Sequence, residues 1–246
     1  MARLARPLRR HRCQRITGLS TPVAVVTGGS RGIGAASAVL LAEQGWDVAI
    51  SFREDETAAI GVVARCQATG RNAMAVRADV AVEADVVAFF RAVDGELGPL
   101  RALVNNAGIV APATRFEDLT RERIERILAV NVTGAFLCAR EAVRRMSTRL
   151  GGEGGVIVNV SSAASRLGSP AEYVDYAASK GAVDTMTIGL AKEVAVEGIR
   201  VNAIRPGVIE TDIHATNGEP GRVARIAPMV PMQRGGTAQE VAAAVA

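Results

Sequence analysis

The chain has 246 residues, of which 49% are apolar and 3% aromatic, and its formal net charge is +4. This length suits one large α/β domain, and there is no internal repeat, no linker and no run of about 20 apolar residues that would span a bilayer. Three widely spaced cysteines and only two histidines argue against a disulfide framework or a metal site, and they predict a reducing, cytoplasmic setting.

The basic charge belongs to the N-terminal tail. Residues 1–20 hold six arginines and no acidic residue, whereas the remaining 23 basic and 25 acidic residues give the body a net charge of −2. We interpret this tail as a disordered extension, with an organelle-targeting segment and weak anion binding as alternatives. Because no aromatic residues are interleaved with its charges, it does not predict a nucleic-acid partner. Residues 21–246 are expected to form a single domain.

The body opens with a strand, a glycine-rich turn and a helix. Residues 22–27 are a short β-branched run typical of a buried parallel strand, and an Ala-rich helix extends to about residue 44. The turn between them lets the backbone approach a pyrophosphate, and the helix N-terminus offers free N–H groups. The pattern therefore predicts a dinucleotide-binding turn. Its expected cofactor-binding residues are Gly28, Ser30, Arg31, Gly32, Ile33 and Gly34.

The second predicted strand, residues 46–52, ends where an acidic residue would bind the hydroxyls of an adenosine ribose. This chain has Arg53 there, and Arg31 stands in the glycine turn. Two guanidinium groups suit a 2′-phosphate, although Glu54 and Asp55 follow closely. The sequence thus favours NADP(H) over NAD(H).

Polar turns follow the next two predicted strands, residues 72–77 and 101–104. After the first, Asp79 and Val80 are candidates for adenine contacts, with a loop-bracing or capping role for Asp79 as the alternative. After the second, Asn105 either ties neighbouring strands together or lies near the ligand. The residues expected to contact the cofactor at that second turn are Asn106, Ala107 and Gly108.

The second half of the chain continues the alternation. A helical segment, residues 121–149, is interrupted around Asn131 by residues that disfavour a helix, and such an irregularity can free a backbone carbonyl to hold water. Strands are predicted at residues 155–160 and 199–204. The stretch from there to about residue 236 is rich in Gly, Pro and Met, and it is interpreted as a substrate lid, with a surface excursion as the alternative.

Tyr176 and Lys180 are four residues apart in an Ala-rich segment, so on a helix they share one face. The chain has only two tyrosines and two lysines, against 27 arginines. A neighbouring ammonium group favours the phenolate, so we expect the pKa of Tyr176 to lie below about 10 and the phenol to serve in acid–base chemistry. An ordinary pair on a solvated helix face is the alternative.

Together these elements predict an α/β protein with a three-layer Rossmann fold, in which helices cover both faces of a doubly wound parallel sheet. TGxxxGxG, NNAG, the mid-helix Asn, a serine ahead of YxxxK, and PG after the sixth strand occur in order. Over residues 22–246 the chain resembles the compact single-domain branch of the short-chain dehydrogenase/reductase family, and is similar to its 3-oxoacyl-ACP reductase and glucose dehydrogenase-like members.

The resemblance implies roles for particular residues. Tyr176 would be the general acid/base, Lys180 would lower its pKa and bind the nicotinamide ribose, and Ser162 would polarise the substrate oxygen. Asn131 would join a water-mediated proton relay with Lys180. The stretch that holds the carboxamide would contribute Pro206, Gly207, Ile209 and Thr211.

The leading interpretation is an NADP(H)-dependent carbonyl reductase or alcohol dehydrogenase that forms a homodimer or homotetramer. The alternative is a non-catalytic dinucleotide sensor with the same fold. Methionines in the lid favour an apolar substrate. Because family members continue past the last predicted helix, residues 237–246, into a seventh strand, the chain is expected to lack that strand.

Overall fold

Six parallel strands form one sheet at the centre of the molecule, and their order across the sheet is β3-β2-β1-β4-β5-β6. The computed structural model describes residues 21–211 and 218–246, so the predictions for the basic tail lie outside the described residues. The strands are β1 (Val23–Val26), β2 (Asp47–Phe52), β3 (Ala73–Arg77), β4 (Leu100–Asn105), β5 (Gly155–Val160) and β6 (Ile199–Ile204).

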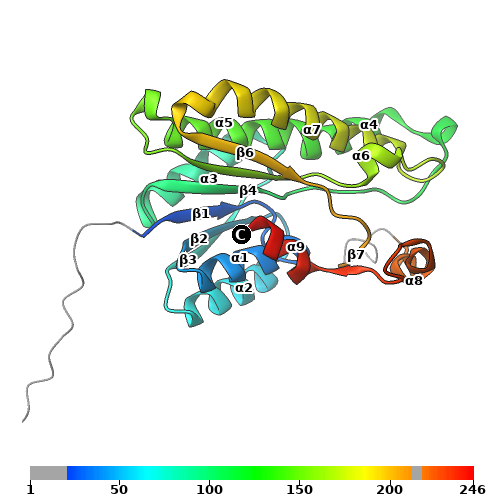
Figure 1. Cartoon of the computed structure of the whole chain (residues 1–246), viewed down its shortest axis with the longest axis horizontal. Helices are drawn as coiled ribbons and strands as arrows, with labels where there is room; N and C mark the ends of the chain where they lie inside the picture. The colour runs from blue at the N-terminus through cyan, green and yellow to red at the C-terminus, as the bar shows by residue number, and fades with distance from the viewer. Residues whose placement is uncertain (1–20, 212–217) are drawn as a thin grey trace, which may run out of the picture.

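Helices cover both faces of this sheet (Figure 1). One face carries α1 (Gly32–Glu43), α2 (Glu56–Ala68) and α9 (Ala238–Val245). The other carries α3 (Glu83–Glu96), α5 (Gly134–Met146) and α7 (Val174–Val194). The shorter helices α4 (Arg121–Leu128), α6 (Ala164–Leu167) and α8 (Arg222–Ile226) lie near the carboxyl ends of the strands (Figure 1). The predicted three-layer α/β fold is confirmed.

The apolar runs become strands because this sheet is buried on both sides. In β1 every side chain has an exposed fraction of 0%. Val23 and Val25 pack into the core under α3 and α5, whereas Ala24 and Val26 pack against α1 and α2. Alternate residues of one strand thereby belong to two separate cores, as the two-residue repeat of a strand requires.

The helical segment after residue 120 is interrupted at the predicted place. Thr120 caps α4 by accepting a hydrogen bond from the backbone N–H of Arg123. The π-helix η2 (Ala129–Thr133) then separates α4 from α5 and places Asn131 in its middle. An extra residue in a helical turn changes the backbone hydrogen bonding locally, and such insertions often mark functional sites.

The segment after β6 contains more regular structure than its composition predicts. The strands β7 (Ile209–Glu210) and β8 (Gly236–Thr237) pair in parallel, and α8 and the 3₁₀ turn η6 (Ala227–Met229) lie between them in sequence. A capping box of Thr237 and Glu240 begins α9. Within residues 21–211 and 218–246, no helix is both long enough and apolar enough to cross a membrane.

Candidate functional site

A cavity of about 740 Å³ opens at the carboxyl ends of the parallel strands, where ligands of open α/β sheets bind. Its walls come from the loops after β1, β2, β3, β4, β5 and β6 and from the segment that contains α8. The predicted site residues that line it are Gly28, Ser30, Arg31, Gly32, Ile33, Arg53, Asp79, Val80, Asn106, Ala107, Gly108, Ser162, Tyr176, Lys180, Pro206, Gly207, Ile209 and Thr211. Gly34 and Asn131 stand behind this wall.

The glycine turn needs its glycines for two reasons. Gly28 and Gly32 have φ angles of +62° and +54°, a region that favours glycine. A Cβ atom on Gly34 would lie 2.4 Å from the carbonyl oxygen of Gly28 and 2.5 Å from Nδ2 of Asn106, so no side chain fits there. A Cβ atom on Gly32 would approach the Thr211 side chain at 3.3 Å, which brings the loop after β6 to the same turn.

The two asparagines after β4 brace the backbone. Asn106 donates from Nδ2 to the carbonyl oxygens of Thr27 and Gly28, at 2.9 and 3.1 Å, and therefore holds the glycine turn with its side chain. Asn105 is buried and donates from Nδ2 to the carbonyl oxygen of Ala135 at 2.8 Å. Asn105 was predicted either to tie neighbouring strands together or to lie near the ligand. Its side chain has a structural role, but it ties β4 to α5 and not to a neighbouring strand.

Arg53 at the end of β2 faces the cavity and forms an ion pair with Glu54, with both side chains largely exposed. Asp55 is occupied elsewhere, since its Oδ1 caps α2 by accepting from the backbone N–H of Ala58 at 2.8 Å. Arg31 is exposed at the start of α1. Arg31 and Arg53 thus border one end of the cavity together with Glu54, which pairs with Arg53, and Asp55, which caps α2.

Asp79 braces its own loop. Its carboxylate accepts from the backbone N–H of Ala81 at 2.9 Å and pairs with Arg126 at 3.1 Å. Burial acts to raise the pKa of Asp79, but these hydrogen bonds outweigh it and hold the pKa below the ordinary value. The carboxylate therefore braces its loop, and the residue also lines the cavity.

Tyr176 lies in the first turn of α7, and Ser162 follows β5. Burial raises the pKa of Tyr176, and a hydrogen bond from the Ser162 hydroxyl offsets the rise only in part. The predicted lowering of this pKa by Lys180 is therefore wrong for the described structure. The raised pKa keeps the phenol protonated at neutral pH.

Lys180 explains this difference. Its ammonium group is buried, donates to the carbonyl oxygen of Val160 at 2.8 Å, and stands 5.7 Å from the centroid of the Tyr176 ring. Burial lowers the pKa of Lys180 itself to about 8, against a smaller opposing effect of Asp184. The pKa of Tyr176 is raised above its ordinary value of 10, so Lys180 has lost its charge before the phenol ionises and cannot lower the phenol's pKa.

A buried lysine with this pKa makes the stability depend on pH. The unfolded chain keeps the proton up to about the ordinary pKa of 10.5, whereas the folded chain releases it near 8. Between these values the unfolded state binds more protons, so raising the pH favours folding. We expect the free energy of unfolding of the wild type, minus that of Lys180→Met, to increase from pH 8 to pH 10.5 in urea titrations. A difference that stays flat or falls over this range would contradict the assignment.

Asn131 uses its whole side chain to hold the loop after β4. Its Oδ1 accepts from the backbone N–H of Ile109 at 2.8 Å, and its Nδ2 donates to the Ile109 carbonyl at 2.9 Å and to Ser179 Oγ at 3.0 Å. A Cβ atom on Gly108 would lie 3.4 Å from both Asn131 Oδ1 and Lys180 Nζ. Asn131 thus meets Gly108 and Lys180, two residues of the cavity wall, from behind.

The outer wall of the cavity contains residues that the sequence analysis did not predict for the site. Arg222 and Tyr173 line it together with apolar side chains from α6, α8 and the turn that follows α8. These apolar residues are Leu167, Ile226, Met229, Val230 and Pro231. Met229 and Val230 belong to the segment that was predicted to be a lid from its Gly, Pro and Met content. No motif or spacing in the sequence indicated that Arg222 or Tyr173 would line the cavity.

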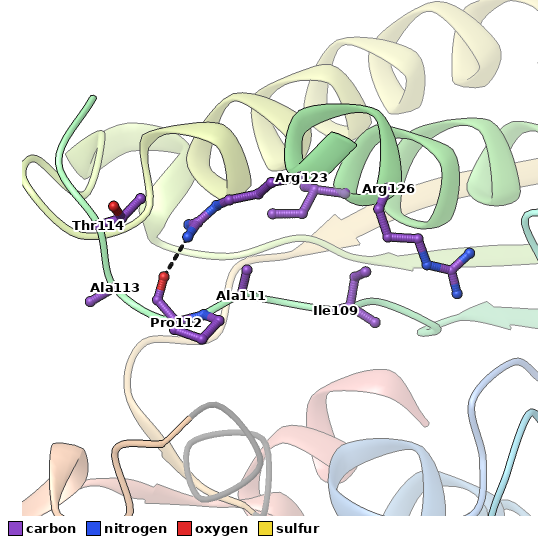
Figure 2. Close-up of a pocket in the computed structure, with 8 residues that line it drawn as sticks. Ile109, Ala111, Pro112, Ala113, Thr114, Arg123 and Arg126 are labelled. Atoms are coloured by element: carbon purple, nitrogen blue, oxygen red, sulfur yellow. Dashed lines mark hydrogen bonds between the residues drawn. The ribbon is translucent and has the colours of Figure 1, made fainter. Parts of the chain in front are cut away.

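A second, smaller cavity of about 420 Å³ lies beside α4 and the loop after β4 (Figure 2). Arg123 crosses this cavity and donates to the carbonyl oxygen of Pro112 at 2.5 Å (Figure 2). The same guanidinium group binds Asp175, which directly precedes Tyr176, through Nε–Oδ2 at 2.7 Å. The side chain of Asp175 is only 3% exposed, so this ion pair is buried at the start of the helix that carries Tyr176.

Comparisons with known proteins agree with this arrangement. The family model of the short chain dehydrogenases matches residues 22–220. The uncharacterized oxidoreductase YgfF of Escherichia coli K12 is 58% identical over 223 residues, which cover 91% of this chain and 90% of that protein.

Solved structures extend the similarity to the fold. A short chain dehydrogenase from Burkholderia cenocepacia in complex with NADP has a TM-score of 0.84 and 38% identity, covering 92% of this chain and 89% of that one. The 3-ketoacyl-(acyl-carrier-protein) reductase from Brucella melitensis complexed with NADH has a TM-score of 0.83 and 33% identity, covering 92% and 90%. The chain belongs to the short-chain dehydrogenase/reductase family and is an NAD(P)-dependent oxidoreductase that acts on CH–OH or C=O groups.

Proposed function

We propose that the protein is an NADP(H)-dependent oxidoreductase that interconverts an apolar carbonyl compound and its secondary alcohol, with Tyr176 as the general acid/base. The observation that carries this proposal is that two hydroxyl-bearing residues, Ser162 and Tyr176, line the same cavity at the carboxyl ends of the strands together with Lys180. Lys180 is fixed one helical turn beyond Tyr176.

The described residues fit a dinucleotide. The turn has no room for a side chain at Gly34, so its backbone stays open to a pyrophosphate at the N-terminus of α1. Asp79 and Val80 would border the adenine, and Asn106, Ala107 and Gly108 would form the floor. Near the nicotinamide would lie Lys180, Pro206, Gly207, Ile209 and Thr211. When bound, the cofactor supplies or accepts the hydride.

The side chains of the site suit the proton chemistry of a reduction. A phenol whose pKa is raised holds its proton at neutral pH and can donate it as negative charge develops on a carbonyl oxygen. The Ser162 hydroxyl, which lines the same cavity, would donate a second hydrogen bond to that oxygen in place of its interaction with Tyr176. Lys180 and Asn131 hold the surroundings in place, the first through β5 and the second through the loop after β4.

The preference for NADP(H) is supported by the charges at the end of β2. Arg53 and Arg31 offer guanidinium groups for a 2′-phosphate, and the carboxylate of Asp55 is occupied as the cap of α2. Similar proteins have been solved both with NADP and with NADH, so the preference needs its own test.

Cofactor titrations test this preference. We expect Arg53→Ala to raise the dissociation constant for NADPH about tenfold, because one charged hydrogen-bonding partner of the phosphate is lost, and to change that for NADH less than about twofold. Arg77→Ala is the matched control, since Arg77 is an exposed arginine at the end of the neighbouring strand β3. Cofactor fluorescence gives both constants. An equal effect on NADPH and NADH would remove the basis for the NADP(H) preference.

Turnover separates the enzyme from a non-catalytic sensor. Tight NADPH binding together with oxidation of NADPH in the presence of an apolar ketone or β-keto ester would support the enzyme. Binding without turnover across such a panel would favour the sensor. We further propose a single domain over residues 21–246 and a cytoplasmic homodimer or homotetramer; exposed apolar side chains on α5 and α7, Phe136 and Ile188, support self-association.

A further inference from the structure

Four charged side chains join the lid to the segment just before α7. Arg222 donates from Nη2 to Glu172 at 2.7 Å and from Nη1 to Glu219 at 3.0 Å. Arg225 donates from Nη2 to Glu172 at 2.9 Å and from Nε to Glu219 at 2.8 Å. Each glutamate thus binds both arginines. We name these four residues the lid network.

Tyr173 connects this network to the wall of the cavity. The Arg222 guanidinium stacks over the Tyr173 ring at 4.6 Å from its centroid, and the Tyr173 hydroxyl donates to Glu219 at 3.2 Å. The Arg222 side chain is only 12% exposed and lines the cavity. Among the cavity-lining residues in the described segment 218–246, Arg222 is the one that carries charge; the others are apolar.

The network is electrically neutral at neutral pH. Hydrogen bonds from the arginines lower the pKa of Glu172, and they lower that of Glu219 against the effect of burial. The pKa of Arg222 is raised, because bonds to the two glutamates outweigh its burial. Two positive and two negative charges therefore cancel, and both Nη groups of Arg222 already have carboxylate partners.

We propose that Glu172 and Glu219 determine specificity by neutralising Arg222, so that the outer part of the cavity accepts uncharged substrates and discriminates against carboxylates. This inference rests on the proposed function. A cation among the apolar side chains of this wall would otherwise attract an anionic substrate strongly, because apolar surroundings weaken an ionic interaction less than bulk water does. With both glutamates in place, a substrate carboxylate meets a guanidinium group that is already paired and two negative charges beside it.

Removing one negative charge tests the proposal. Glu172→Gln keeps the shape and one acceptor oxygen but leaves the network with a net charge of +1. With NADPH, we compare kcat/KM for acetoacetate, an anion, with that for its uncharged ethyl ester. The ratio of acid to ester is expected to rise about tenfold in Glu172→Gln. Glu219→Gln, which removes the other carboxylate, is expected to change the ratio in the same direction.

The control is a glutamate in a similar pair far from the cavity. Glu153 pairs with Arg101 at 2.6 Å and precedes β5, at the opposite end of the sheet, so Glu153→Gln is expected to leave the ratio unchanged. In Arg222→Met the cation is absent, and the ratio is expected not to rise. Thermal melts confirm that each variant is folded. An unchanged acid-to-ester ratio in both folded glutamate variants would overturn the proposal, as would a wild type that prefers acetoacetate.

A binding measurement keeps this test separate from the proposed function. If the wild type oxidises NADPH with neither compound, the proposed reaction on such substrates fails, but calorimetric titration of acetoacetate into the NADPH-saturated protein still tests the network. About tenfold tighter binding to Glu172→Gln than to wild type supports the neutralising role. Equal affinities for the two proteins overturn it.

Discussion

Replacement of Tyr176 by phenylalanine is expected to lower kcat about a thousandfold and to leave the dissociation constant for NADPH within about twofold. General acid–base groups contribute roughly 10²- to 10⁴-fold to rates, and here the phenol is the group that faces Ser162 on the cavity wall. The phenylalanine ring keeps the packing in the first turn of α7. Lys180 stays bonded to the Val160 carbonyl, so the region expected to hold the cofactor is preserved.

Steady-state kinetics and cofactor fluorescence measure the two quantities, and Tyr173→Phe provides the matched control. Tyr173 is the other tyrosine of the chain and lines the same cavity, but its hydroxyl donates to Glu219 in the outer wall. We expect its loss to change kcat no more than about threefold. A residual kcat within tenfold of wild type in Tyr176→Phe would mean that another group delivers the proton, and Tyr176 would lose its assigned role.

The strands were predictable from the sequence because each is a short, largely apolar run, and the inner strands β1, β2, β4 and β5 are mostly buried. β5 and β6 have the predicted bounds, and β1 to β4 differ from the predictions by a single residue at the ends that moved. The glycine turn was predictable for a similar reason: the positive φ angle at Gly28 favours glycine, and the contact at Gly34 leaves no room for a side chain. Both features depend on residues that are close together in the sequence, so a short sequence pattern is enough to predict them.

Contacts between side chains were predicted less well. The spacing of two residues shows that they share a helix face, but it does not show where their side-chain atoms lie. Tyr176 and Lys180 do share a face of α7, yet the long lysine side chain reaches the Val160 carbonyl, and its charge does not lower the pKa of the phenol. Asn131 was expected in a relay with Lys180 on the strength of the resemblance. The interruption of the helix at Asn131 was predicted, but neither its π-helical form nor the bonds of Asn131 to Ile109 were.

Contacts between residues that are far apart in the chain left no recognisable pattern in the sequence. Arg222 lies 50 residues from Glu172, and Arg123 lies 52 residues from Asp175. Neither pair has a sequence signature, because the elements that bring the partners together are positioned by the whole sheet. The consequence is that both sides of the segment before Tyr176 are held by arginines, Arg222 from the lid and Arg123 from α4.

Substitution of Arg123 by methionine is expected to lower the free energy of unfolding by about 3 kcal/mol, because it leaves a buried carboxylate without its cation. Asp175 is 3% exposed, and after the change it would keep the backbone N–H of Tyr176 as a donor, at 2.9 Å. Urea titration measures the effect. Arg121→Met is the matched control on the same helix, since Arg121 is 84% exposed in its pair with Glu125, and its loss should cost less than about 1 kcal/mol.

The same variant separates positioning from simple destabilisation. Because Asp175 adjoins Tyr176 whereas Lys180 is anchored on β5, a loosened first turn of α7 should lower kcat about tenfold and leave the NADPH dissociation constant within about twofold. The double variant Arg123→Met/Asp175→Asn should regain part of the stability, since it removes the unpaired charge. If Arg123→Met and Arg121→Met instead prove equally stable, the buried pair contributes no more than a surface one. The start of α7 must then be held mainly by the lid network on its other side.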